Sequence, residues 1–290
     1  MMKKISVLSV LVGCLGSLAV SQAQETMMSP PKVLSVTREM IKPGKGAVHE
    51  KWEAGWPRAF AKAKWPVHYL AVASLTGQPR ALFMTGYDSL AAWEKDAAAQ
   101  EKNTALSAEQ AALADKDGEY LTEIRNAVFL YMPELSYHPD LAVAGARYFR
   151  IYNITVKPGH DDHFVEARKV ALAAHEKANL PDHFAVFHAI AGGPTTQYLI
   201  FIPMKSLAEV DEFPTVHGKA YKEALGEEGQ KKLAEFDSQG VESSESQIFA
   251  FSPKMSYPPK EWVAADPDFW APKAAPAAKP AAAKKEAPTQ

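Results

Sequence analysis

"WPVHYLAVAS" (residues 65–74) and "LPDHFAVFHA" (residues 180–189) lie 115 positions apart and share one pattern. In each, a proline follows a large apolar residue, and a histidine precedes a run of apolar residues typical of a buried strand. A segment that recurs at a fixed offset indicates that a larger structural unit recurs with it. The sequence is therefore expected to contain the same unit twice.

The match continues on both sides of these segments. "IKPGKG" (residues 41–46) lies over "VKPGHD" (residues 156–161) at the same offset of 115. Near the ends of the two copies, "FLYMPELSYHP" (residues 129–139) lies over "FAFSPKMSYPP" (residues 249–259) at an offset of 120. Because the offset changes only by lengths typical of loops, we predict a tandem duplication that gives two equivalent halves.

The predicted halves, residues 33–139 and 146–259, each show the order strand, helix, strand, strand, helix, strand. A Pro-Gly pair ends the first strand of each half, since proline cannot continue a ladder. "SLAE" (residues 206–209) is a capping box that starts the second helix of the second half. One face of the first helix of the first half carries apolar residues at spacings of three or four: Val48, Trp52, Trp56, Phe60 and Ala63.

This βαββαβ order predicts an α+β fold built from two tandem ferredoxin-like units. One such sheet has helices on a single face, so its other face needs a partner. We expect the two sheets to pack face to face. The arrangement resembles the dimeric α+β barrel superfamily, with the usual homodimer replaced by a fused pair, and it predicts a chain that is a monomer with pseudo-dimeric halves.

Two short motifs carry a closer resemblance. "RIYNITVKPG" (residues 150–159) is similar to the opening strand of NIPSNAP-type domains, and "FPTVHGKAYKEAL" (residues 213–225) resembles the second helix of antibiotic-biosynthesis-monooxygenase domains. The first half departs from both patterns, since Ser35 and Thr37 replace Arg150 and Tyr152, and Gln100 stands near the place of His217. The resemblance implies a monooxygenase-like activity on an aromatic substrate, either cofactor-independent or haem-handling.

The N-terminus is predicted to direct export. Lys3 and Lys4 precede an apolar run at residues 5–20, and small residues follow at the −3 and −1 positions of a cleavage site after Ala23. We expect a signal peptide at residues 1–23, a linker at residues 24–32, and a periplasmic or secreted protein. The alternative is a lipoprotein anchored through Cys14.

Composition excludes several classes of function. Cys14 is the one cysteine of the chain, so the mature protein has no thiol for catalysis or metal binding. Without the signal segment and the last twenty residues, 26 basic and 33 acidic residues remain, which excludes a basic nucleic-acid-binding surface. The apolar leader is too short for a stable transmembrane span. Residues 260–290 are expected to form a disordered Ala/Pro/Lys-rich tail whose lysines could contact the envelope.

Comparison of the two halves draws attention to four histidines, one of which could line a ligand pocket. His68 and His183 occupy equivalent positions, and each either points into the barrel or simply bonds a backbone carbonyl. His175 replaces Phe60, which leaves room that is either refilled by aromatic side chains or open as a ligand pocket. His188 has no counterpart and is interpreted as a core histidine.

Polar side chains on the first strand of the second half are further ligand-binding candidates: Arg150, Tyr152 and Asn153. No metal site is predicted. His160, His163 and Glu166 share one helical face and are the weak candidates for one, although acidic residues at a helix start need no metal.

These observations give three hypotheses. The first is an exported protein that binds a small, aromatic or anionic molecule in the barrel or in the second half. The alternative is the monooxygenase-like enzyme, with no cofactor predicted and haem as a minor possibility. The third is a structural or interaction protein without catalysis.

Overall fold

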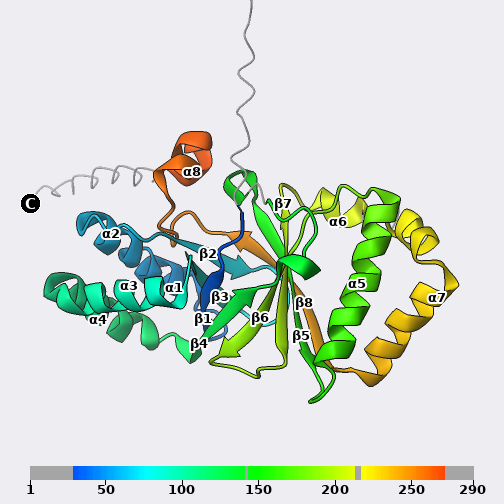
Figure 1. The fold of residues 1–290 in the computed structure, drawn as a ribbon. Coiled ribbons are helices and arrows are strands. Elements are labelled where there is room, and N and C mark those ends of the chain that lie inside the picture. Colours follow the sequence, from blue (N-terminus) through cyan, green and yellow to red (C-terminus); the bar gives the residue numbers. More distant parts are fainter. Residues whose placement is uncertain (1–28, 141–142, 213–216, 272–290) are drawn as a thin grey trace, which may run out of the picture.

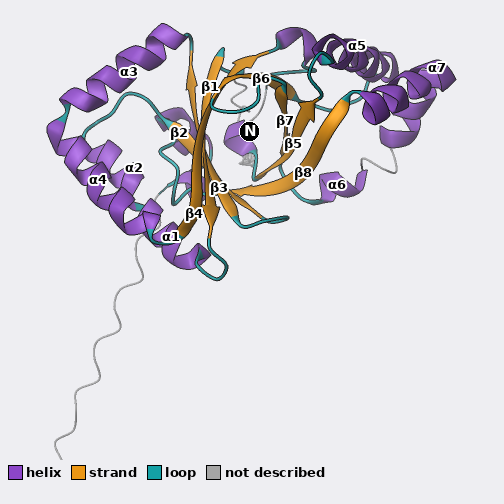
Figure 2. Ribbon diagram, turned by 90° about the horizontal axis from the view of Figure 1, so that it is seen from below, coloured by secondary structure: helices purple, strands orange, loops and turns teal. Residues whose placement is uncertain are grey.

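The computed structural model describes residues 29–140, 143–212 and 217–271. Within them, eight strands close a barrel in the order β1-β3-β2-β8-β5-β7-β6-β4. Helices of the two halves lie on opposite outer sides of this barrel (Figure 2). The α+β barrel expected from the sequence is confirmed.

The first half supplies four strands and four helices, labelled in Figure 1. They are β1 (Val33–Ile41), α1 (Gly46–Glu53), α2 (Gly55–Lys62), β2 (Tyr69–Ser74), β3 (Arg80–Tyr87), α3 (Leu90–Lys102), α4 (Thr104–Gly118) and β4 (Leu121–Tyr131). The second half repeats this order with fewer helix breaks. Its elements are β5 (Tyr148–Val156), α5 (Asp161–Ala178), β6 (Ala185–Ala191), β7 (Gln197–Met204), α6 (Ala208–Glu212), α7 (Gly218–Gln239) and β8 (Val241–Phe251).

The barrel closes through edge pairing as well as through packing. Within each half the spatial order is that of a ferredoxin-like sheet, β4-β1-β3-β2 and β8-β5-β7-β6. Strand β2 then pairs with β8, and β4 pairs with β6. Each half thus covers the edges that the other would expose, and unpaired edges are a hazard that barrels remove.

The two halves make the same hydrogen bonds where the first strand meets the last. A backbone N–H donates across this junction in both, and a lysine Nζ donates to the preceding carbonyl. The bonds are Lys42 N to Tyr120 O (2.9 Å), Lys157 N to Gly240 O (2.8 Å), Lys42 Nζ to Glu119 O (2.7 Å) and Lys157 Nζ to Gln239 O (2.8 Å). In the predicted capping box Glu209 Oε1 accepts from Ser206 N, and at the matching helix start of the first half Ser89 Oγ accepts from Ala92 N.

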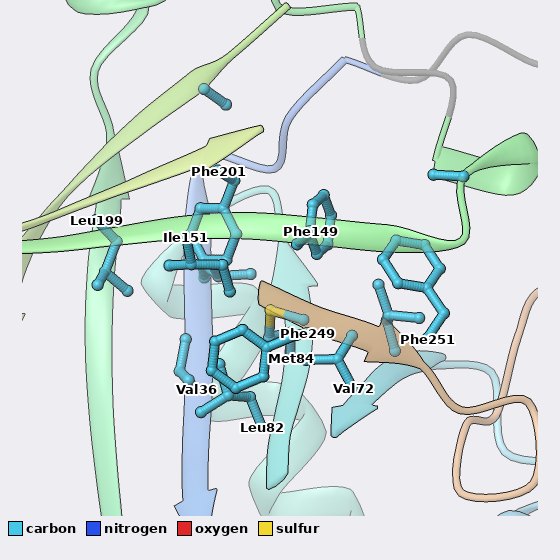
Figure 3. Packing of buried hydrophobic residues seen from close by; sticks show 14 of the residues in the cluster. Val36, Val72, Leu82, Met84, Phe149, Ile151, Leu199, Phe201, Phe249 and Phe251 are labelled. Atoms are coloured by element: carbon cyan, nitrogen blue, oxygen red, sulfur yellow. The ribbon is translucent and has the colours of Figure 1, made fainter. Parts of the chain in front are cut away.

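The main core lies inside the barrel, where alternate residues of every strand meet. Figure 3 shows Val36, Leu82 and Met84 of the first half among Ile151 and Leu199 of the second. Phenylalanines fill the centre, and Phe149 contacts both Phe201 and Phe251 with ring centroids 5.5 and 4.8 Å apart.

The start of the predicted tail is ordered, which corrects the expectation that residues 260–290 are disordered. Helices α8 (Lys260–Ala265) and α9 (Pro267–Trp270) place Trp262 and Trp270 in the barrel core. The Trp270 indole N–H donates to Ala144 O at 2.8 Å. Burial of two tryptophans outweighs the polar composition around them, because each large aromatic side chain removes a large apolar area from water.

Several predictions fall outside the described residues. They are the signal peptide at residues 1–23, most of the linker, the tail from residue 272 onward, and residues 213–216 of the second family-like motif. In the part of the chain that is described, none of the helices has the length and apolar character needed to cross a bilayer.

Candidate functional site

Four acidic or histidine side chains converge between the sheet and the helices of the first half. Glu39 comes from β1, His49 and Glu53 from α1, and Asp117 from the last turn of α4. One coordinating atom of each lies within 4.8 Å of those of the others, and all four residues are buried. We call this group the acid–histidine cluster.

The local sequence explains how these side chains meet. Alternation along β1 sends Val36 into the barrel and Glu39 to the opposite face, under the helices. His49 and Glu53 are four residues apart and therefore share one face of α1. Asp117 reaches the same place because α4 lies beside α1 against this face of the sheet (Figure 1).

The imidazole of His49 is held in one orientation. Its Nδ1 lies 3.0 Å from both carboxylate oxygens of Asp117. Nδ1 therefore carries the proton and donates a hydrogen bond to that carboxylate. The lone pair of Nε2 then faces Glu39 Oε2 at 3.8 Å, beyond hydrogen-bond distance. His49 is 1% exposed and Glu39 9%, and neither Nε2 nor Oε2 has a hydrogen-bond partner among the described residues.

Burial of three carboxyl groups shapes the electrostatics of the cluster. Burial, together with the negative charges of Glu39 and Asp117, raises the pKa of Glu53 to about 9. Burial likewise raises the pKa of Glu39 to about 7, with His49 opposing and Asp117 adding to the shift. Across residues 29–140, 143–212 and 217–271, no lysine or arginine forms an ion pair with these carboxylates. The cluster is consequently a site of strong negative potential when ionised.

Tyr69 brings a hydrogen-bond donor to the cluster. Its hydroxyl oxygen is buried and unpartnered within the described structure. Burial raises its pKa well above the ordinary value, and the nearby Glu53 and Glu39 add to this, so the phenol stays protonated. Its ring packs against Phe60 and Tyr257, with centroids 5.7 and 6.4 Å away. An aromatic wall therefore adjoins the acid–histidine cluster.

The second half fills the equivalent place with two apolar side chains and one arginine. At the offset of 115, Ile154, Phe164 and Arg168 stand for Glu39, His49 and Glu53. Phe164 contacts Phe236 at a centroid distance of 5.9 Å, and the residue that matches Asp117 at the offset of 120 is the exposed Asp237. These aromatic and aliphatic residues belong to one packed cluster, with Phe164 only 1% exposed.

The paired histidines lie outside the strands that were expected to carry them. His68 precedes β2 and stacks on Tyr257 with ring centroids 4.5 Å apart. His183 precedes β6, and its Nδ1 donates to His138 O at 2.8 Å. This is the carbonyl-bonded alternative for His183, and neither histidine joins the acid–histidine cluster.

His175 is packed rather than placed on an open wall. Its Nδ1 donates to Ala171 O at 2.8 Å, and its ring contacts Phe184 and Tyr221 at centroid distances of 5.2 and 4.7 Å. Its Nε2 lies 3.6 Å from Asp182, whose other oxygen accepts from His217 at 2.9 Å. The volume lost by replacing Phe60 is thus refilled with aromatic rings.

The first strand of the second half splits its three candidates between two faces. Asn153 lines a cavity inside the barrel and accepts a hydrogen bond from Gln197 at 2.6 Å. Arg150 and Tyr152 alternate with it, the guanidinium lying 4.9 Å from the Tyr152 ring centroid and donating to Ser246 Oγ. The three side chains therefore do not form one site.

The weak metal candidates are also dispersed. His160 and His163 are exposed and bring their Nδ1 atoms within 3.0 Å of each other. Glu166 instead pairs with Lys169 at 2.8 Å. The metal-ligand arrangement seen in the described structure lies in the first half. The metal candidates named from the sequence all belong to the second half.

A cavity of about 220 Å³ opens inside the barrel, across β1 from the acid–histidine cluster. The first half contributes three arginines to it, Arg38, Arg80 and Arg125, where the second half contributes Asn153, Gln197 and Glu245. Arg80 donates to both carboxylate oxygens of Glu245 at 3.2 and 3.3 Å. Burial, aided by the charges of Arg125 and Arg80, lowers the pKa of Arg38.

Comparison with known proteins identifies the fold. No family model and no curated protein matches the sequence. Among solved structures, an anthrone oxidase-like protein is similar over 78% of this chain and 94% of its own, with 14% identity and a TM-score of 0.52. A candidate monooxygenase of Fusobacterium nucleatum covers 77% and 94% (12% identity, TM-score 0.49), and a mutant chlorite dismutase of Candidatus Nitrospira defluvii covers 84% and 99% (12%, 0.47).

These matches show the dimeric α+β barrel fold, and each spans both halves of this chain. They correct the first functional hypothesis, that of a protein that only binds a small molecule in the barrel or second half. The matched structure with a TM-score above 0.5 is described as anthrone oxidase-like, which fits the enzymatic alternative better than the first hypothesis. The location of the buried titratable groups, in the first half, agrees with that correction.

Proposed function

We propose that the protein is an oxidative, monooxygenase-like enzyme whose reaction centre is the acid–histidine cluster. The observation that carries this proposal is the orientation of His49: Asp117 holds Nδ1, and the free Nε2 faces Glu39 in a buried site. Buried unpartnered polar atoms cost stability, and the second half places Ile154 and Phe164, which have no polar side-chain atoms, where the first half has Glu39 and His49. Such a cost is typical of functional sites.

The fold supports the class of reaction. The anthrone oxidase-like protein, at a TM-score of 0.52, uses the same barrel. Since a fold alone does not determine an activity, the proposal needs the site as well. The aromatic wall of Phe60, Tyr69 and Tyr257 beside the cluster favours a flat aromatic substrate.

The chemistry proposed is oxidation by dioxygen of an activated methylene (CH₂) group in an aromatic substrate. A substrate R₂CH₂ and O₂ give R₂C=O and H₂O, so dioxygen is the oxidant and no external reductant is required. The acid–histidine cluster supplies acceptors near the acidic hydrogen. The Tyr69 hydroxyl donates a hydrogen bond to the oxyanion that develops on the substrate.

Oxygen uptake with anthrone as the probe tests this function. We expect consumption of O₂ above the spontaneous rate and one labelled oxygen in the anthraquinone formed under ¹⁸O₂. Tyr69→Phe should lower kcat about 10- to 1000-fold. The matched control is Tyr257→Phe, whose hydroxyl instead donates to Trp65 O at 2.9 Å and should leave kcat within about twofold. No uptake above the spontaneous rate, or equal rates for wild type and Tyr69→Phe, would contradict the proposal for this probe class.

Haem is not used in the proposed chemistry. A haem iron needs an axial ligand such as a histidine nitrogen. At His175, the most buried histidine of the second half, Nδ1 donates to Ala171 O and Nε2 faces Asp182. This residue therefore does not fit that role, and haem stays a prediction of the resemblance alone.

Two further proposals concern origin and location. The repeat offsets, which change only from 115 to 120, support descent of the halves from one duplicated unit. The paired hydrogen bonds at Lys42 and Lys157 support it as well. The charged and apolar N-terminal residues support an enzyme that acts in the periplasm or outside the cell.

A further inference from the structure

The acid–histidine cluster has the donor set of a metal centre. We infer that His49 Nε2, Glu39 and Glu53 bind one divalent first-row metal ion, while Asp117 orients the imidazole. The binding itself is independent of the proposed function, but its catalytic use rests on it.

The spacing of the side chains fits one ion. Metal–oxygen and metal–nitrogen bonds of about 2.1 Å place neighbouring ligand atoms about 3 to 4 Å apart. His49 Nε2 and Glu39 Oε2 are 3.8 Å apart, and the whole set lies within 4.8 Å. Two buried atoms that face each other without a hydrogen bond are therefore at the separation that an ion between them requires.

Asp117 supports this assignment from the far side of the ring. A histidine that binds a metal usually donates its other ring N–H to a carboxylate, which fixes the tautomer. The 3.0 Å contacts from His49 Nδ1 to both oxygens of Asp117 provide that arrangement. The lone pair of Nε2 is left directed at Glu39.

Charge balance gives a third, independent argument. Three carboxyl groups share a buried volume without a neighbouring lysine or arginine in the described chain. In the second half, the position of Glu53 is taken by Arg168, a built-in cation that lies 4.9 Å from the Phe184 ring centroid. Because burying unpaired charge is costly, these carboxyl groups can ionise together only with a cation, which no lysine or arginine of the described first half provides.

The ligand types limit the metal. Carboxylates favour Mn²⁺ and other hard ions, and imidazole favours Fe²⁺ and Zn²⁺. One imidazole and two carboxylates therefore select ions such as Mn²⁺, Fe²⁺ or Zn²⁺. Three protein ligands leave coordination positions open, and the Tyr69 hydroxyl is a donor near enough for the charges of Glu53 and Glu39 to act on it.

Mn²⁺ binding to the chelated, desalted full-length chain tests the inference. Electron paramagnetic resonance of free Mn²⁺ should show one ion bound per chain, and Zn²⁺ should displace it. His49→Phe and Glu39→Gln should each weaken binding at least 100-fold, and Asp117→Asn about 10- to 100-fold. The control His163→Gln, at the exposed histidine pair, should bind as wild type does.

Circular dichroism shows whether each variant is folded, and Asp117→Asn preserves the shape of the site if His49→Phe does not fold. Absence of a stoichiometric site, retention of binding in both Glu39→Gln and Asp117→Asn, or loss of binding in His163→Gln would overturn the inference. Metal bound at the cluster without oxidation of anthrone would sink the proposed function alone. Full oxidation by metal-free protein would contradict only the catalytic use of the metal, because binding at the cluster is measured separately.

Discussion

The two halves of this barrel share their backbone plan but differ in what lies between helices and sheet. In the second half, Phe164 and Phe236 pack ring against ring at 5.9 Å in an apolar cluster. In the first half, His49 and Asp117 occupy that place and are joined by a hydrogen bond of 3.0 Å. The fold therefore does not require the polar set.

The difference shows how the buried side chains of each half contribute to the stability of the fold. An apolar interface gains from burial at about 25 cal/mol per Å². A buried acid–histidine set loses desolvation energy unless every group is paired. We read the second half as the part that supports the barrel and the first as the part that performs chemistry. Four predictions test this contrast between the two halves.

The largest effect is expected when charge is moved into the apolar half. Phe164→Glu places a carboxylate where the wild-type ring is 1% exposed and packed on Tyr198. An unpaired buried charge should lower the free energy of unfolding by about 3 to 5 kcal/mol. Urea denaturation measures this, with Asp162→Glu, at an exposed position of the same helix, as the control. A loss below about 1 kcal/mol would show that this half is not a packed support.

The reverse exchange should stabilise the metal-free protein. Glu39→Ile and His49→Phe introduce the matching residues of the second half, and Asp117→Phe introduces a ring like that of Phe236, which contacts Phe164. We expect the triple variant to gain about 1 to 4 kcal/mol, as replaced buried ion pairs often do. His49→Phe alone should lose about 1 to 3 kcal/mol, because Asp117 is left buried and unpaired. Urea denaturation of chelated samples should show this reversal of sign, and equal losses in both variants would contradict it.

The pH dependence of stability should differ between these proteins. Burial raises the pKa values of Glu39 and Glu53 to about 7 and about 9, above the unfolded value of 4.5. The folded state then binds more protons than the unfolded state above pH 4.5, so stability is full below that pH and falls as pH rises. From pH 5 to 8 the free energy of unfolding of the metal-free wild type should fall by several kcal/mol, since a pKa difference of one corresponds to about 1.4 kcal/mol.

Denaturation across this pH range in the presence of a chelator measures the slope. Glu39→Ile combined with Glu53→Leu should flatten it. A wild-type slope that rises with pH, or an unchanged slope in the double variant, would contradict the assigned shifts.

The smallest effect is expected inside the barrel. Arg38 and Arg125 lie directly opposite each other on β1 and β4, whereas the matching second-half residues are Asn153 and Glu245. Like charges directly across a pair of strands destabilise it by up to about 1 kcal/mol. Arg38→Met should therefore raise the stability by about 0.5 kcal/mol at low salt, while the exposed control Arg58→Met should not. A loss of stability would show that Arg38 is held favourably in the cavity.

The fold could be read from the sequence because periodic and repeated signals specify it. The Pro-Gly turns after Ile41 and Val156 end the first strands, and the repeat offsets place the remaining elements. Composition could not predict that helices α8 and α9 form at the start of the C-terminal segment, since two tryptophans among Ala, Pro and Lys give no periodic pattern.

The site was missed for a different reason. His49 and Glu53, four residues apart on α1, were the available signal, but Glu39 and Asp117 are separated from them by strand alternation and by a helix 68 residues away. Convergence of side chains from three elements depends on packing, which a single sequence does not state. Comparison of the halves did indicate side-chain volume lost at His175. In the structure the rings of Phe184 and Tyr221 fill that volume.

Anomalous diffraction from crystals grown with MnCl₂ tests the central claim most directly. We predict one strong anomalous peak within about 2.5 Å of His49 Nε2 and of the Glu39 and Glu53 carboxylates, and none between Phe164 and Phe236. A peak at the exposed pair His160 and His163, or no peak in the first half at saturating Mn²⁺, would contradict the division of labour between the halves.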